Sequence, residues 1–104
     1  MKKQNWINPK TDRLFKAILK LDNLDEARRF FRDLLTEREI EEFASRWEVA
    51  WLLAKNTPYS KIEKETGMSS TTIARISKWL NEGMGGYKLL IKKFGNQVNH
   101  HSLA

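Results

Sequence analysis

The sequence contains no cysteine, which excludes disulfides and thiolate metal sites and fits a reducing compartment. It has only two prolines and five glycines in 104 residues, so we expect an ordered helical chain rather than a disordered one. No apolar run is long enough to span a membrane, and the first residues lack the apolar centre of a signal peptide. We therefore expect a single cytoplasmic domain over residues 1–104, with no membrane partner.

Signatures of catalysis and of metal binding are also lacking. No nucleophile–base pairing, phosphate-binding loop or dinucleotide fingerprint occurs, so we predict that the protein is not an enzyme. The only histidines, His100 and His101, are adjacent in a polar tail and have neither helical ligand spacing nor a third partner. We therefore predict no metal site and no cofactor.

Positive charge, by contrast, is plentiful and unevenly placed. Residues 1–54 carry 11 basic and 10 acidic side chains, whereas residues 55–104 carry 8 basic and 3 acidic ones. The second half therefore holds nearly all of the net charge of +6. Such a field attracts phosphates and provides sequence-independent affinity for nucleic acid, although a basic surface can also serve solubility alone.

Helical periodicity and capping signals predict an all-α chain of six helices. Capping boxes are expected at Asn23 with Glu26 and at Thr36 with Glu39, and Thr57 before Pro58 is a further helix start. We expect helices from residue 11, over about 24–36, 37–55, 58–66 and 70–81, and a last one closed by Gly95. Residues 1–10 are predicted to be a flexible arm and residues 96–104 a flexible tail.

The long helix over residues 37–55 is apolar on nearly all sides in its last two turns, from Val49 to Ala54. Such a helix must be buried all round, and one layer of neighbours in so small a domain can hardly do that. A second chain could, so the pattern predicts a homodimer. Trp47 and Trp51 on this helix are expected to be core or interface anchors rather than an aromatic ligand cage.

Residues 57–81 form a predicted helix-turn-helix, with Gly67 at the turn between two short helices. Glycine adopts the left-handed conformation of such a turn because it has no Cβ atom. Ser69 is the expected N-cap of the second helix. The spacing directs five side chains into a small shared core: Ile62, Thr66, Met68, Ile73 and Ile76.

The outward side of the second helix carries small, hydroxyl and basic side chains, which suit contact with base edges and phosphates of double-stranded DNA. The helix start itself favours an anion, and lysines on the preceding helix can reach the DNA backbone. These features predict a sequence-specific transcriptional regulator that binds DNA through its helix-turn-helix. The predicted DNA-binding residues are Lys61, Lys64, Ser69, Ser70, Thr71, Thr72, Ala74, Arg75 and Lys78.

Two other functions stay open from the residues alone. The helix-turn-helix can serve as a protein-interaction module whose basic face meets an acidic partner. RNA binding is the third alternative, but the chain shows no strand pattern of a stacking platform. Salt-sensitive binding to a two-fold-symmetric duplex distinguishes DNA regulation from both.

The stretch from Leu34 to Leu80, LLTEREIEEFASRWEVAWLLAKNTPYSKIEKETGMSSTTIARISKWL, resembles the tryptophan repressor superfamily, and within it the YerC/YecD branch. It has a threonine-capped long helix with a central arginine, Arg46, and a helix-turn-helix ending in Ile73-Ala74-Arg75. The resemblance implies a six-helix tryptophan-repressor-like fold, assembled as an intertwined homodimer that places two recognition helices on a two-fold-symmetric operator. It also implies that the regulator is a repressor.

The resemblance also implies an effector pocket, formed by Arg46, Arg75, Ile76 and Trp79. In the tryptophan repressor, arginines matching Arg46 and Arg75 line the tryptophan site. A glycine that makes room for the indole is replaced here by Ile76, and a serine that meets the ligand by Trp79. These larger side chains predict that the pocket is filled, so that the protein needs no tryptophan or takes an unknown small-molecule effector.

Overall fold

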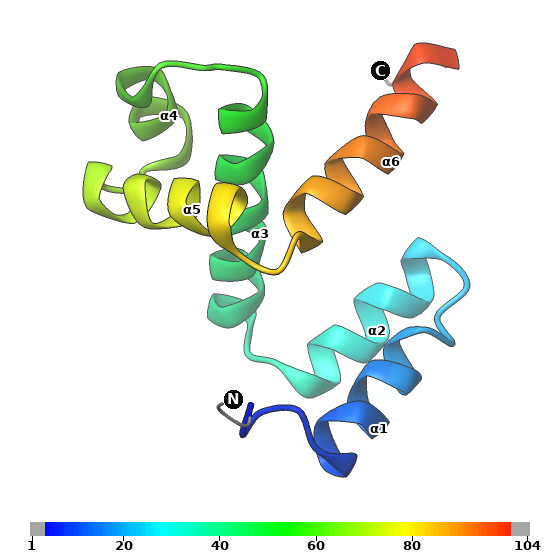
Figure 1. The fold of residues 1–104 in the computed structure, drawn as a ribbon. Coiled ribbons are helices and arrows are strands. Elements are labelled where there is room, and N and C mark those ends of the chain that lie inside the picture. Colours follow the sequence, from blue (N-terminus) through cyan, green and yellow to red (C-terminus); the bar gives the residue numbers. More distant parts are fainter. Residues whose placement is uncertain (1–3, 101–104) are drawn as a thin grey trace. The chain divides into compact units, whose positions relative to one another are not determined.

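The computed structural model describes residues 4–100, and its side chains through Gly95. Helices account for all of the regular structure in this part of the chain, as predicted, and Figure 1 shows their order. The helices are α1 (Pro9–Ile18), α2 (Leu24–Leu34), α3 (Glu37–Ala54), α4 (Tyr59–Thr66), α5 (Ser70–Glu82) and α6 (Gly86–His100). They form two compact units that divide between Ile40 and Glu41.

The first unit contains α1, α2 and the first turn of α3. The helix α1 begins at Pro9, two residues before the predicted start, because Asn8 and Thr11 form a reciprocal capping box. Pro9 and Lys10 are thus helical, although they were assigned to the predicted arm. Neither α1 nor α2 buries a side chain completely. The unit therefore lacks a closed core of its own.

Polar caps define the starts of α2 and α3. The Asn23 side chain accepts a hydrogen bond from the Glu26 N–H, as predicted. The Glu26 carboxylate, however, accepts from the Asp22 N–H rather than from the Asn23 N–H, so the reciprocal capping box is incomplete. At α3 the box is complete and confirms the prediction. The Thr36 N–H donates to Glu39 Oε1 over 2.9 Å, and the Glu39 N–H donates to Thr36 Oγ1 over 3.1 Å.

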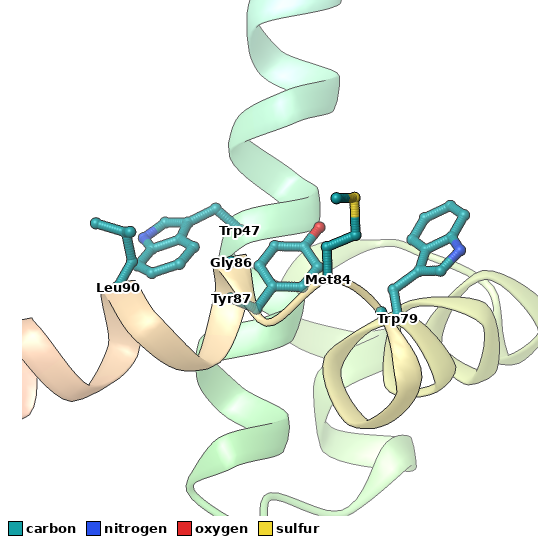
Figure 2. Close-up of a pocket in the computed structure, with 7 residues that line it drawn as sticks. Trp47, Trp79, Met84, Gly86, Tyr87 and Leu90 are labelled. Atoms are coloured by element: carbon teal, nitrogen blue, oxygen red, sulfur yellow. The ribbon is translucent and has the colours of Figure 1, made fainter. Parts of the chain in front are cut away.

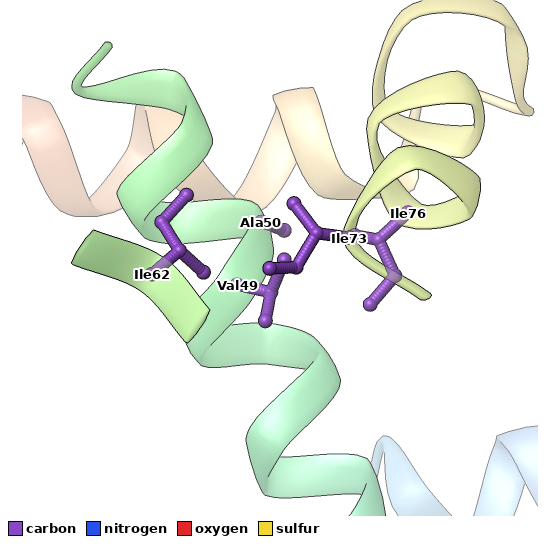
Figure 3. Close-up of a cluster of buried hydrophobic side chains, with 5 residues drawn as sticks. All are labelled: Val49, Ala50, Ile62, Ile73 and Ile76. Atoms are coloured by element: carbon purple, nitrogen blue, oxygen red, sulfur yellow. The ribbon is translucent and has the colours of Figure 1, made fainter. Parts of the chain in front are cut away.

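The second unit has a small apolar core, drawn in Figure 3. Its centre is fully buried and comes from three helices: Val49 and Ala50 of α3, Ile62 of α4, and Ile73 and Ile76 of α5. Tyr87 and Ile91 of α6 pack against it. The core therefore fixes the α4–α5 pair on α3, and the buried positions 62, 73 and 76 agree with the prediction.

The turn between α4 and α5 confirms the predicted roles of Gly67 and Ser69. Gly67 has φ +73°, and its N–H donates to the Glu63 carbonyl to close α4. Ser69 then caps α5 by accepting from the Thr72 N–H over 3.2 Å. This geometry sets the angle at which α5 leaves the turn.

The predicted N-cap at Thr57 is wrong. The cap residue of α4 is Pro58, and α4 has no side-chain capping bond. The Thr57 N–H instead donates to the Leu52 carbonyl over 3.0 Å. Thr57 therefore belongs to the end of α3, where Asn56 reverses the chain in the left-handed conformation with φ +62°.

The predicted end of the last helix at Gly95 is also wrong, since α6 continues to His100. A glycine inside a helix costs about 1 kcal/mol relative to alanine but does not stop the backbone hydrogen bonding. Residues 96–100 of the predicted tail are therefore helical in their backbone. The rest of that tail, with His101, lies outside the described residues.

Candidate nucleic-acid interface

The helix α5 has two chemically different sides. Ile73, Ile76 and Leu80 point into the core and are buried, so they hold the helix in place. The opposite side exposes Ser70, Thr71, Ala74, Arg75 and Lys78. No acidic residue occurs from Ser70 to Asn81, and Glu82 stands at the end of the helix. The exposed side therefore combines hydrogen-bonding groups with positive charge over its first two and a half turns.

The four hydroxyl residues at the start of α5 are not equivalent. The Ser69 hydroxyl donates to Thr72 Oγ1 over 3.1 Å and accepts from the Thr72 N–H. These two side chains satisfy each other, and Thr72 is half-buried. Ser70 and Thr71 are exposed, and Thr71 lines the same surface depression as Arg75 and Lys78. The hydroxyl best placed beside the basic groups is therefore that of Thr71.

The helix α4 adds two exposed lysines at the edge of this face. Lys61 forms only a long, solvent-exposed ion pair of 4.0 Å with Glu65, which is weak and readily replaced by a phosphate. Lys64 is exposed as well. Glu63, a position where helix-turn-helix motifs often carry a small residue, is also exposed and does not enter the core.

The four residues of the predicted effector pocket do not share one environment. Ile76 is 0% exposed within the core, whereas Trp79 is 44% exposed on α5. Trp79 and Arg75 line the same depression. Arg46 is half-buried on α3, and its guanidinium carbon lies 5.7 Å from the centre of the Phe43 ring. The described residues therefore bring Arg75 and Trp79 together, while Ile76 is enclosed by the core.

An apolar opening of about 590 Å³ lies beside Trp79 instead, and Figure 2 shows its lining. Its walls come from α3, α5, α6 and the connection between α5 and α6: Trp47, Trp79, Gly83, Met84, Gly86, Tyr87 and Leu90. The Trp47 and Tyr87 rings lie 6.3 Å apart. Burial raises the pKa of the Tyr87 phenol above 10.0, while the charge of Arg46 opposes that rise. The phenol therefore stays neutral at physiological pH.

Other classes of site find no support in the part of the chain that the structure describes. The side chains that the structure describes, from residue 4 to Gly95, include no group of three or more metal-ligating residues. Within the same range, every helix is too short or too polar to cross a bilayer.

Comparison with known proteins identifies relatives along most of the chain. A family model for the Trp repressor protein matches residues 9–94. The uncharacterized protein YerC of Bacillus subtilis is 45% identical over 82 residues, which is 79% of either chain. The crystal structure of a TrpR-like protein from Eubacterium eligens has a TM-score of 0.85 and 38% identity, covering 88% of this chain and 94% of that one. A crystal structure from Staphylococcus aureus has a TM-score of 0.85 and 34% identity, covering 91% and 95%.

These matches confirm the predicted resemblance and the six-helix fold. They favour a helix-turn-helix transcription regulator and agree with the prediction that the protein is not an enzyme. By its sequence along residues 9–94 and by its fold, the chain belongs to the Trp repressor family.

Proposed function

We propose that the protein is a sequence-specific DNA-binding repressor whose helix α5 enters the major groove. The observation that carries this proposal is the two-sided character of α5, buried through Ile73, Ile76 and Leu80 and exposed through Thr71, Arg75 and Lys78. A recognition helix needs such a rigid base, because base contacts require a fixed orientation. The positive charges provide affinity for phosphates, and the small side chains allow close approach to base edges.

The acting species in this proposal is a homodimer. The first unit buries no side chain completely, and large apolar groups such as Leu19, Leu24 and Met84 are 65–81% exposed. Monomeric proteins rarely leave so many apolar groups in water, so a second copy of the chain is the expected cover. Two copies related by a two-fold axis then present two α5 helices to a two-fold-symmetric operator.

The proposed repressor does not depend on tryptophan. The side chain of Ile76 is embedded in the core, and the indole of Trp79 stands next to Arg75 on α5. Opening a site for a free indole there would require Ile76 to leave a close-packed core, which costs several kcal/mol. We expect isothermal titration of the protein with L-tryptophan to give no micromolar binding. A clear one-to-one isotherm would overturn this part of the proposal.

Selection of binding sites from random duplexes tests the main proposal. We expect an enriched sequence with two-fold symmetry, bound more tightly than random duplex and with an affinity that falls steeply with salt. Fluorescence anisotropy on the selected duplex and on a scrambled one measures that difference. Absence of binding to any duplex even at low salt would contradict DNA regulation and favour the protein-interaction module.

A further inference from the structure

A second opening, of about 440 Å³, lies on the other side of α5 from Trp79, where the end of α3 meets α5 and α6. Leu53, Leu80 and Ile91 form its apolar floor. Its rim carries Ser77 and Asn81 of α5 and Lys88 and Lys92 of α6. The opening therefore joins an apolar surface to two positive charges.

The two lysines stand one helical turn apart on α6, at positions i and i+4. Like charges at this spacing repel each other and destabilise a helix slightly. No carboxylate lines the opening, and neither lysine forms an ion pair within the described residues. An anion between the two ammonium groups would remove this repulsion.

Capping of α3 does not account for the lysines. Lysine side chains near a helix C-terminus can bond to the last free carbonyls. Here the Leu52 carbonyl already accepts from the Thr57 N–H over 3.0 Å, and the Leu53 carbonyl accepts from the Asn56 N–H over 2.9 Å. The Leu52 and Leu53 carbonyls are therefore already satisfied by the backbone. Among the described residues neither Lys88 nor Lys92 donates a hydrogen bond to a carbonyl of α3, which leaves both available to a ligand.

We propose that this opening binds a small organic anion, with its carboxylate or phosphate between Lys88 and Lys92 and its apolar part on Leu80 and Ile91. The Asn81 side-chain amide donates to the Ser77 carbonyl over 2.9 Å, which fixes the position of this polar group on the rim. A ligand held there contacts both α5 and α6. Its effect on DNA affinity rests on the proposed function of α5, whereas its binding does not.

Isothermal titration of the intact protein with three matched probes tests the site. The probes are hexanoate, hexyl phosphate and the neutral hexanamide. We expect one-to-one binding of at least one anion and binding of hexanamide weaker by about tenfold or more, the loss expected for a hydrogen bond to a charged group. The stronger anion identifies the headgroup. Equal binding of all three probes, or no binding of any, would overturn the proposal.

Lys92→Gln and Lys93→Gln form a matched pair of variants on α6. Lys92 lines the opening, whereas the neighbouring Lys93 does not, so each change removes one charge from the same helix. Lys92→Gln should lower the affinity of the protein for the anion by about tenfold. Lys93→Gln should leave that affinity unchanged. Equal losses in both variants would mean attraction to net charge only and would refute a defined site.

Anisotropy of a selected duplex, measured with and without the bound anion, tests the regulatory role. A several-fold change in DNA affinity that disappears in Lys92→Gln supports an effector site. If the DNA affinity is the same with and without the anion, the site has no regulatory role. Binding of the anion itself is still decided by calorimetry. If no duplex binds at all, the proposed function of α5 fails, and the anion site is judged by calorimetry alone.

Discussion

At the scale of single residues, neighbouring threonines on α5 have different surroundings. Thr71 is exposed beside Arg75 and Lys78, whereas Thr72 is half-buried and bonded to Ser69. The sequence alone predicts that both threonines contact DNA, because a run of hydroxyl residues does not reveal which side chain bonds to the cap residue Ser69. The structure thus places these two candidate residues in different surroundings.

Thr71→Ala should weaken binding to the selected operator by about 1–3 kcal/mol, since one base contact is lost. Binding to scrambled duplex should stay the same, because phosphate contacts are intact.

Thr72→Ala should instead lower the melting temperature, as it loses the bond to Ser69. Lys78→Ala is the control for a phosphate contact, and it should weaken both duplexes alike and flatten the salt dependence. Equal loss on both duplexes for Thr71→Ala would contradict base readout.

At the scale of elements, the turn at Gly67 sets the direction of α5. Its φ of +73° lies in the left-handed region, and a Cβ atom added there would meet nothing within 4 Å. Gly67→Ala should therefore destabilise the fold through backbone conformation alone, by about 1–2 kcal/mol. Gly67→Asn should cost less, because asparagine tolerates this conformation. Urea unfolding measures both variants, and equal stability of alanine and asparagine would argue against this explanation.

The capping box at the start of α3 makes stability depend on pH. Hydrogen bonds from the backbone N–H and the side chain of Thr36 hold the pKa of the Glu39 carboxyl below its ordinary value of 4.5. A lowered folded-state pKa contributes stability that is fully present above 4.5 and is lost as the pH falls through the folded pKa.

Glu39→Gln removes this titration while keeping a side-chain oxygen that can accept the bond. The wild type should therefore melt at a higher temperature than Glu39→Gln at neutral pH, and the difference should shrink as the pH falls below 4.5. Thermal unfolding followed by circular dichroism measures the difference. A constant difference at all pH values would exclude the carboxylate as its cause.

The sequence predicted the elements well where one residue determines the local backbone. Gly67, Ser69 and the Thr36–Glu39 pair act within one turn, so their roles follow from residue type. The prediction at Thr57 was wrong because the backbone already reverses at Asn56. The prediction at Gly95 was wrong because α6, whose Phe94 ring lies against Trp47 and Trp51 of α3, continues through this glycine. The anion site at Lys88 and Lys92 was missed, since its walls come from three helices that no local pattern joins.

At the scale of the whole molecule, the distribution of apolar groups argues for assembly. The centre of the Trp51 ring lies 6.2 Å from the ring centres of both Trp47 and Phe94. Despite these contacts, Trp51 is only half-buried. Phe94 and Leu90 of α6 are themselves 38% and 41% exposed. The partly exposed aromatic cluster and the first unit without buried side chains would both be covered in the homodimer proposed above.

Light scattering should therefore give a particle of twice the chain mass of 12.3 kDa, with a melting temperature that rises with protein concentration. Trp51→Glu places a charge in the aromatic cluster and should cost about 3–5 kcal/mol or more, a large part of the stability of a small domain. If core and interface are the same surface, this variant should lose its helical signal rather than give a folded monomer. Ser60→Glu adds the same charge at an exposed site on α4 and should remain a folded dimer. A folded Trp51→Glu monomer would show that each chain is stable alone, which contradicts an intertwined assembly.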